Sequence, residues 1–161
     1  LGIGPVLKDR SAINIGVVSC MSYLDDKGFG PSLVHRNGVT RARMFQEITI
    51  AQQTDCSDDA ALSAALDQLE ATLNSPLGNM KGDYCVGQYT LADCAWAGVC
   101  QVATNMGKGT AVSSRSAVNT WFAAVQSHPS TSKEAINPFS CLSTKADHDS
   151  NSMRDVRINT A

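Results

Sequence analysis

The side chains of this chain that could perform chemistry are mainly thiols. A cysteine acts as a nucleophile or a metal ligand when a basic neighbour, a helix start or a metal lowers its pKa. Cys20 lies in an apolar stretch without such a neighbour, which favours packing over catalysis. No C-x-x-C pair and no cysteine–histidine cluster with zinc spacing is present, so we predict reduced, structural thiols and no metal site. The six cysteines are Cys20, Cys56, Cys85, Cys94, Cys100 and Cys141.

The histidines and acids form no catalytic pattern either. His35, His128 and His148 are isolated, and none has a cysteine or an acid at ligand spacing on the same helix face. No pair of carboxylates has the arrangement of a general acid and a general base. We therefore predict no catalytic residue among these side chains.

Two neighbouring arginines allow two interpretations. Arg41 and Arg43 lie at the start of a predicted helix over 40–53, where a cation opposes the helix dipole. They either belong to a solvated polar face or bind an anionic group, such as a carboxylate of a partner. The sequence leaves both interpretations open.

The stretch 82–98, GDYCVGQYTLADCAWAG, contains the clearest helix start of the chain. Thr90 is a favourable N-cap, and Asp93 three residues later completes a capping box. The residues that follow are small and apolar, which is typical of a buried helix. We predict a central buried helix from Leu91 to about Met106, in which Thr90 and Asp93 have a structural role.

Other segments also have helical periodicity. We expect Trp96 and Trp121 to join the core that these helices enclose. The further predicted helices are one from Ser11, as its N-cap, through Leu24; 40–53; one that begins at 57–59 and ends before Pro76; one capped by Ser114 that ends at His128; and a short one over 130–136.

Charge and hydropathy exclude several classes of function. The net charge of −2 at pH 7 gives no field that would attract nucleic acid or an anionic membrane. No run approaches the ~18–20 apolar residues of a membrane span, although association with a membrane complex stays open. The chain begins at Leu1, which indicates a partial product or one that has lost a transit peptide. The compartment stays open between the cytoplasm and an organelle interior.

The helix start at Thr90 resembles that of a known family. A glycine, a few residues and then Tyr-Thr-Leu-Ala-Asp at 89–93 resemble the capping-box region in the C-terminal helical domain of glutathione transferases. Residues 66–73 and 118–130 are similar to flanking helices of that domain. The resemblance covers about 11–136 and implies an all-α fold: a helical bundle preceded by one remnant helix and followed by an extended polar tail.

The resemblance also implies how the chain is divided. Residues 1–36 would be a lead-in and the remnant helix of a degenerate thioredoxin-like domain, 37–137 the helical domain, and 138–161 the tail. In the family, a Tyr, Ser or Cys of the thioredoxin-like domain stabilises or forms the reactive thiolate of glutathione. Residues 1–36 contain no counterpart of that position, so the resemblance implies no catalytic residue here.

One motif near the start resembles the family's glutathione-binding turn. The run Asp9-Arg10-Ser11-Ala12-Ile13 is similar to the start of that turn, with Arg10 in place of its serine. Asp9 and Ser11 are therefore the candidate glutathione-binding residues that the resemblance gives.

A second register of the same motif is open. Aligned on Tyr23-Leu24, the chain has Gly16 and Val17 at the positions of the family's acid and serine. In either register the contact to the γ-glutamyl group is damaged.

These observations favour one function and leave two others open. The favoured function is a non-catalytic interaction or scaffold module without a cofactor. It would be a subunit of a larger protein assembly in the cytoplasm or an organelle, and it would bind protein and no nucleic acid. The alternative is a glutathione transferase, or a related isomerase or dehalogenase, whose catalytic N-terminal domain is absent from this chain and whose cofactor is glutathione. A third interpretation is a carrier that holds an apolar ligand against the helical domain.

Overall fold

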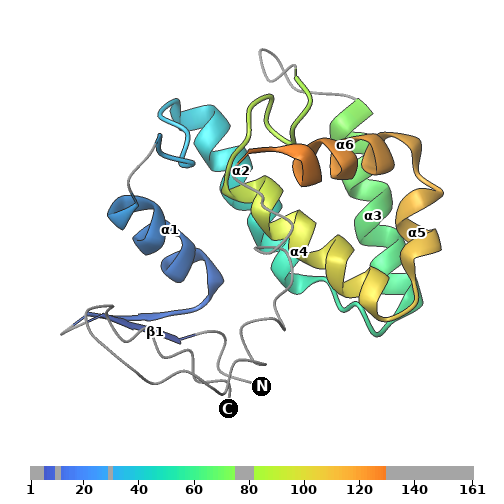
Figure 1. Cartoon of the computed structure of the whole chain (residues 1–161), viewed down its shortest axis with the longest axis horizontal. Helices are drawn as coiled ribbons and strands as arrows, with labels where there is room; N and C mark the ends of the chain where they lie inside the picture. The colour runs from blue at the N-terminus through green and yellow to red at the C-terminus, as the bar shows by residue number, and fades with distance from the viewer. Residues whose placement is uncertain (1–5, 10–11, 29–30, 75–81, 130–161) are drawn as a thin grey trace. The chain divides into compact units, whose positions relative to one another are not determined.

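The computed structural model of the chain describes residues 6–9, 12–28, 31–74 and 82–129 (Figure 1). These residues divide into two compact units, one that ends at Val34 and one that begins at His35. We call them the N-terminal unit and the helical unit. Most of the described residues are helical, which confirms the all-α prediction for the fold class.

The N-terminal unit contains a β-hairpin that the sequence did not predict. Strands β1 (Val6–Asp9) and β2 (Ala12–Ile15) pair antiparallel, with Lys8 opposite Ile13, and helix α1 (Val17–Lys27) follows. The helix expected from Ser11 through Leu24 is present, but it begins at Val17 because β2 occupies the segment after Ser11. Gly16, at φ +89°, makes the turn from strand to helix in a conformation that glycine adopts without strain.

The helical unit is built around one buried helix. Its helices are α2 (Gly38–Gln53), α3 (Asp59–Asn74), α4 (Leu91–Asn105), α5 (Gly109–Ser113) and α6 (Ser116–Ser127). Helix α4 contacts α2, α5 and α6, while α3 packs on α5 and α6 (Figure 1). The bounds of α4 agree with the predicted helix to within one residue. Both tryptophans are buried in the core, as expected.

Side chains fix the starts of α2 and α3. The Asn37 side chain accepts hydrogen bonds from the backbone N–H groups of Val39 and Thr40, at 2.9 and 3.2 Å. Asp58 does the same at α3, where its Oδ1 lies 2.8 Å from the Ala60 nitrogen. Both are favourable N-cap residues, because a short polar side chain satisfies backbone donors that the helix leaves without partners.

The start of α6 differs from the prediction. Ser114 does not cap this helix; it ends α5, and its hydroxyl donates to the carbonyl oxygen of Ala111 at 3.3 Å. Glu70 of α3 instead accepts from the N–H groups of Ala117 and Val118, at 3.1 and 2.8 Å. A carboxylate on one helix therefore caps another, which local sequence could not indicate.

Some predictions fall outside the described residues. These are Ser11 as a candidate ligand residue, the helix end at Pro76, the helix over 130–136, the tail over 138–161 and Cys141.

The carboxylate of Glu70 makes the start of α6 sensitive to acid. Partial burial raises the pKa of Glu70, but the hydrogen bonds from the N–H groups of Ala117 and Val118 lower it. The lowering effects together are larger, so the net shift is downward from 4.5. A carboxylate whose pKa is lower in the folded state stabilises that state at pH values above its unfolded-state pKa. This stabilisation is lost as the pH falls through the folded-state pKa. We expect Glu70→Gln to lower the free energy of unfolding by about 1 kcal/mol at pH 7.

Urea unfolding at pH 7 and at pH 3 measures this effect. The difference between wild type and Glu70→Gln should be smaller at pH 3 than at pH 7, because the wild-type carboxylate becomes protonated as the pH falls. The exposed Asp83, changed to Asn, is the control and should shift neither value. An equal loss at both pH values would show that the charge of Glu70 has no role.

Candidate functional site

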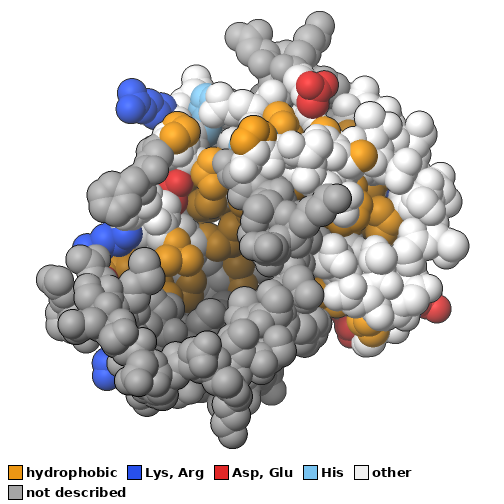
Figure 2. Space-filling view, in the orientation of Figure 1, with side chains coloured by type: hydrophobic (Ala, Val, Ile, Leu, Met, Phe, Trp, Pro, Cys, Tyr) orange, Lys and Arg blue, Asp and Glu red, His pale blue; other side chains and the backbone are white. Residues whose placement is uncertain are grey.

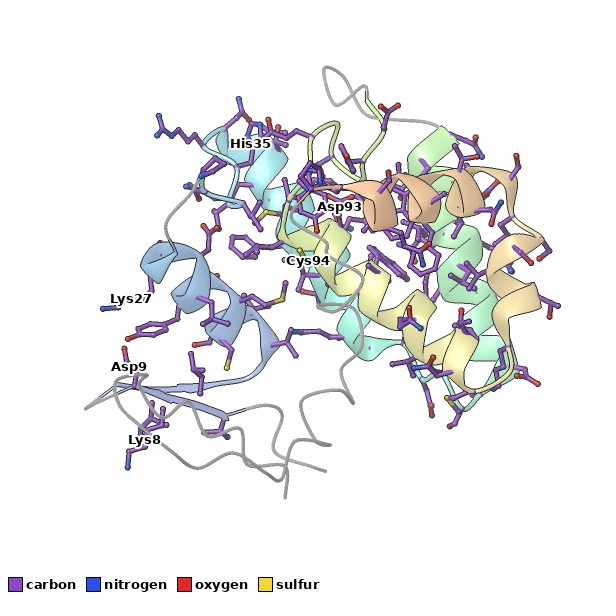
Figure 3. All side chains as sticks on the ribbon, in the orientation of Figure 1. Lys8, Asp9, Lys27, His35, Asp93 and Cys94 are labelled. Carbon is purple, nitrogen blue, oxygen red and sulfur yellow. The ribbon has the colours of Figure 1, made fainter. Side chains whose placement is uncertain are left out.

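The carboxylate of Asp93 is a fully buried acid at the start of α4 that accepts four hydrogen bonds (Figure 3). It lies fully buried in the first turn of α4, where the predicted capping box with Thr90 is present. Its Oδ2 accepts from the backbone nitrogen and the hydroxyl of Thr90, at 2.9 and 3.2 Å. Its Oδ1 accepts from the backbone nitrogen of Cys85 at 2.9 Å and from the indole nitrogen of Trp121 at 2.8 Å.

The loop before α4 is shaped to bring the backbone nitrogen of Cys85 to Asp93. A side chain at Gly82 would overlap the carbonyl oxygen of Gly87, so the two glycines allow the backbone to approach itself closely. Gly87 also has φ +88°, which glycine tolerates best. Steric crowding therefore explains why glycines stand at both positions before the Tyr-Thr-Leu-Ala-Asp run.

Aromatic rings hold the other side of the same loop. The ring of Tyr89 stacks on that of His128 at the end of α6, with centroids 3.9 Å apart and planes 9° apart. Tyr84 meets both rings edge-on, at 5.4 and 5.9 Å. The Tyr89 hydroxyl lies 3.4 Å from the sulfur of Cys94. These contacts fix the loop between the start of α4 and the end of α6.

A second buried carboxylate belongs to Glu47 of α2. It is 0% exposed and lies 2.8 Å from the guanidinium of Arg43, one turn earlier on the same helix. The indole nitrogen of Trp96 donates to its Oε2 at 3.1 Å. The hydroxyl of Thr72 donates to its Oε1 at 3.3 Å and accepts from Arg43 at 2.9 Å. This network connects α2, α3 and α4.

Glu47 is not among the residues that the sequence predicted to have a role. Two signals were available: Glu47 follows Arg43 by four residues on a helix, and a buried tryptophan needs an acceptor for its N–H. Neither signal says which acid meets which indole, because the pairing depends on how the helices pack.

The structure separates the two arginines that the sequence placed together. Arg43 is committed to Glu47 and Thr72, so it is not available to an external anion. Arg41 is exposed, and its side chain makes no ion pair or hydrogen bond with the part of the chain that the structure describes. The two interpretations therefore apply to different residues: Arg43 is structural, and Arg41 faces solvent.

The thiols with a shifted pKa are all less acidic than usual. Burial raises the pKa of Cys100 to about 12. Burial, followed by the carboxylates of Asp93 and Glu47, raises that of Cys85 well above its ordinary value. Burial also raises the pKa of Cys56, with a smaller contribution from Asp55. A thiol with a raised pKa is a poor nucleophile near neutral pH.

Of the two candidate glutathione-binding residues, both in the N-terminal unit, the structure describes Asp9. Asp9 ends β1, and its Oδ2 accepts from the hydroxyl of Tyr23 at 2.7 Å, so this carboxylate holds α1 to the hairpin (Figure 3). Ser11 lies outside the described residues. Helix α1 begins after Gly16 without a side-chain cap and without an acid in its first turn.

Within the described residues, no group of three or more His, Cys, Asp or Glu side chains is placed to hold a metal ion. The helices in that part of the chain are too short or too polar to cross a membrane. No protein-family model matches this chain, and no curated protein matches it.

The buried donors around Asp93 make one substitution diagnostic. Asp93→Ala would leave the N–H groups of Cys85 and Thr90 and the indole of Trp121 without their acceptor. At about 1–3 kcal/mol for each buried donor, we expect the free energy of unfolding to fall by at least about 3 kcal/mol. Urea unfolding followed by circular dichroism measures it.

Two further variants serve as comparisons for Asp93→Ala. The exposed Asp83→Ala should change stability by less than about 0.5 kcal/mol. If Asp93→Ala does not fold, Trp121→Phe removes one donor together with its hydrogen bond and should cost less. Wild-type stability in Asp93→Ala would contradict the role of this carboxylate.

The raised pKa of Cys100 predicts slow reaction with thiol reagents. At pH 8 the folded chain should leave this thiol unmodified, because both burial and the small thiolate fraction oppose reaction. Alkylation followed by peptide mass spectrometry, with and without urea, measures this directly. Rapid labelling of Cys100 in the folded chain would contradict it.

Proposed function

We propose that this chain is a non-catalytic interaction module with a helical domain of the glutathione transferase type, and that it acts as a subunit of a larger protein assembly. The observation that carries the proposal is the use of its buried acids. Asp93 and Glu47 are 0% exposed and accept hydrogen bonds from the helices and the loop around them. A carboxylate that is closed off from solvent and bound to structural donors cannot reach a substrate.

The start of α1 supports the same proposal. In the resembled family this region binds the γ-glutamyl group of glutathione through an acid and a serine. In the register set by Tyr23-Leu24, Gly16 and Val17 stand at those positions and offer no polar side chain. Asp9, the candidate from the other register, is hydrogen-bonded to Tyr23.

The exposed apolar residues support binding to protein. In the helical unit, Val39 is 72% exposed, and Val102 on α4 and Met106 just after its end are 40% and 48% exposed. Val102 and Met106 are one helical turn apart and so lie on the same side of α4. Apolar side chains that cluster on a surface often mark a site of association.

Glutathione distinguishes this proposal from the enzyme alternative. We expect no saturable heat when glutathione is titrated into the chain. We also expect no acceleration of the reaction between glutathione and an aryl halide. An authentic glutathione transferase serves as the positive control. Saturable binding that is lost in Asp9→Asn, or catalysed thioether formation, would contradict the proposal.

Association itself needs a separate measurement. Proteins that co-purify with the full chain would be expressed, purified and mixed with it again, and the mass of the product would be measured by light scattering. We expect a complex of fixed stoichiometry. Recovery of the chain only as a monomer in every such mixture would count against an interaction module.

A further inference from the structure

The exposed side of α2 has a composition unlike the rest of this acidic chain. Its only acid is Glu47, which is fully buried, so no negative charge of α2 reaches solvent. The residues that reach solvent are apolar, uncharged or cationic. We give the name α2 face to seven exposed residues, six of the helix and Arg36 just before it: Arg36, Val39, Arg41, Ala42, Gln46, Thr49 and Gln53.

The α2 face has an uncharged strip with binding groups on both sides. Ala42, Gln46 and Thr49 recur at three- and four-residue spacing, opposite the buried side of the helix. Val39 lies at one margin of this strip and Arg41 at the other. Val39 is 72% exposed, more than any other large apolar side chain among the described residues.

Both arginines lie at the start of α2, one just before its N-cap and one within its first turns. Asn37 is the N-cap, so Arg36 is the residue before the cap and Arg41 the fourth residue of the helix. Neither guanidinium has an ion-pair or hydrogen-bond partner in the described ranges of the chain. In Figure 2, basic side chains and a histidine lie together at the upper left, over the start of α2.

The binding groups here are side chains and not the end of the helix. Asn37 already accepts from the N–H groups of Val39 and Thr40, so these donors are occupied. An anion at this face would therefore meet Arg36 and Arg41. Guanidinium groups bind carboxylates in a planar, two-bond geometry.

We propose that the α2 face is the docking surface for an acidic amphipathic helix of a different protein. This inference rests on the proposed function and adds the chemistry of the partner. Charge complementarity selects the occupant, because the exposed charges of the face are all positive. A second copy of this chain would bring the same face across a two-fold axis and would offer no acid to pair with Arg36 or Arg41.

A pair of designed peptides tests the proposal. Each is an amphipathic helix with leucines at three- and four-residue spacing; one has glutamates along both margins and the other has lysines at the same positions. Binding to the full chain is measured by fluorescence anisotropy at low and high salt. We expect the glutamate peptide to bind at least tenfold more tightly than the lysine peptide, and this preference to shrink at high salt.

Charge reversal locates the binding. The double variant R36E/R41E should weaken binding of the glutamate peptide at least tenfold. The matched control K8E/K27E makes the same change in net charge at two exposed lysines of the N-terminal unit and should bind as wild type does. Circular dichroism checks that both variants fold. The proposal is overturned if the lysine peptide binds as tightly as the glutamate peptide, or if R36E/R41E binds like wild type.

Two further outcomes separate this proposal from the proposed function. If R36E/R41E and Val39→Asp still form the reconstituted complex, the module has a partner but uses another surface, and the α2 face is wrong. If wild type scatters light as a dimer and Val39→Asp as a monomer, the occupant is a second copy, which also overturns the proposal. Turnover of glutathione would instead contradict the proposed function.

Discussion

The helical unit depends on one buried carboxylate. Moving the side chain of Asp93 out of water is costly unless donors replace the lost hydration, and here three separate elements supply them. The loop contributes the N–H of Cys85, the start of α4 contributes Thr90, and α6 contributes the indole of Trp121. One residue therefore starts a helix, shapes the loop before it and positions the helix that packs against it.

Glu47 repeats this arrangement between α2 and α4. Its contacts to Arg43, Thr72 and Trp96 connect α2, α3 and α4. Each of the two buried tryptophans thus donates its indole N–H to a buried acid. Directional hydrogen bonds of this kind restrict how the helices pack, whereas apolar contact alone tolerates sliding. The same contacts keep both acids away from any ligand, which links the stability of the unit to the proposed non-catalytic function.

The sequence predicted what depends on neighbouring residues. The start and length of α4 and the burial of both tryptophans follow from local patterns of capping and hydrophobicity. Features that depend on residues distant in the sequence were missed or predicted wrongly. For example, Ser114 does not cap α6, because Glu70 of α3 accepts from the first N–H groups of α6 instead. The hairpin was missed because four-residue strands leave too short an alternation to identify. Arg43 turns inward only because Glu47 and Thr72 meet it there, and no local rule separates it from Arg41.

Hydrogen exchange of individual protons tests the central role of Asp93 most directly. If its carboxylate is a fixed part of the core, the amide protons of Cys85 and Thr90 and the indole proton of Trp121 should exchange only through global unfolding. Their exchange free energies should then equal that of the slowest amides in α4 and fall with the same denaturant dependence. Exchange of these three protons at the rate of the exposed loop amides of Asp83 and Gln88 would show that the site opens locally and would contradict this account.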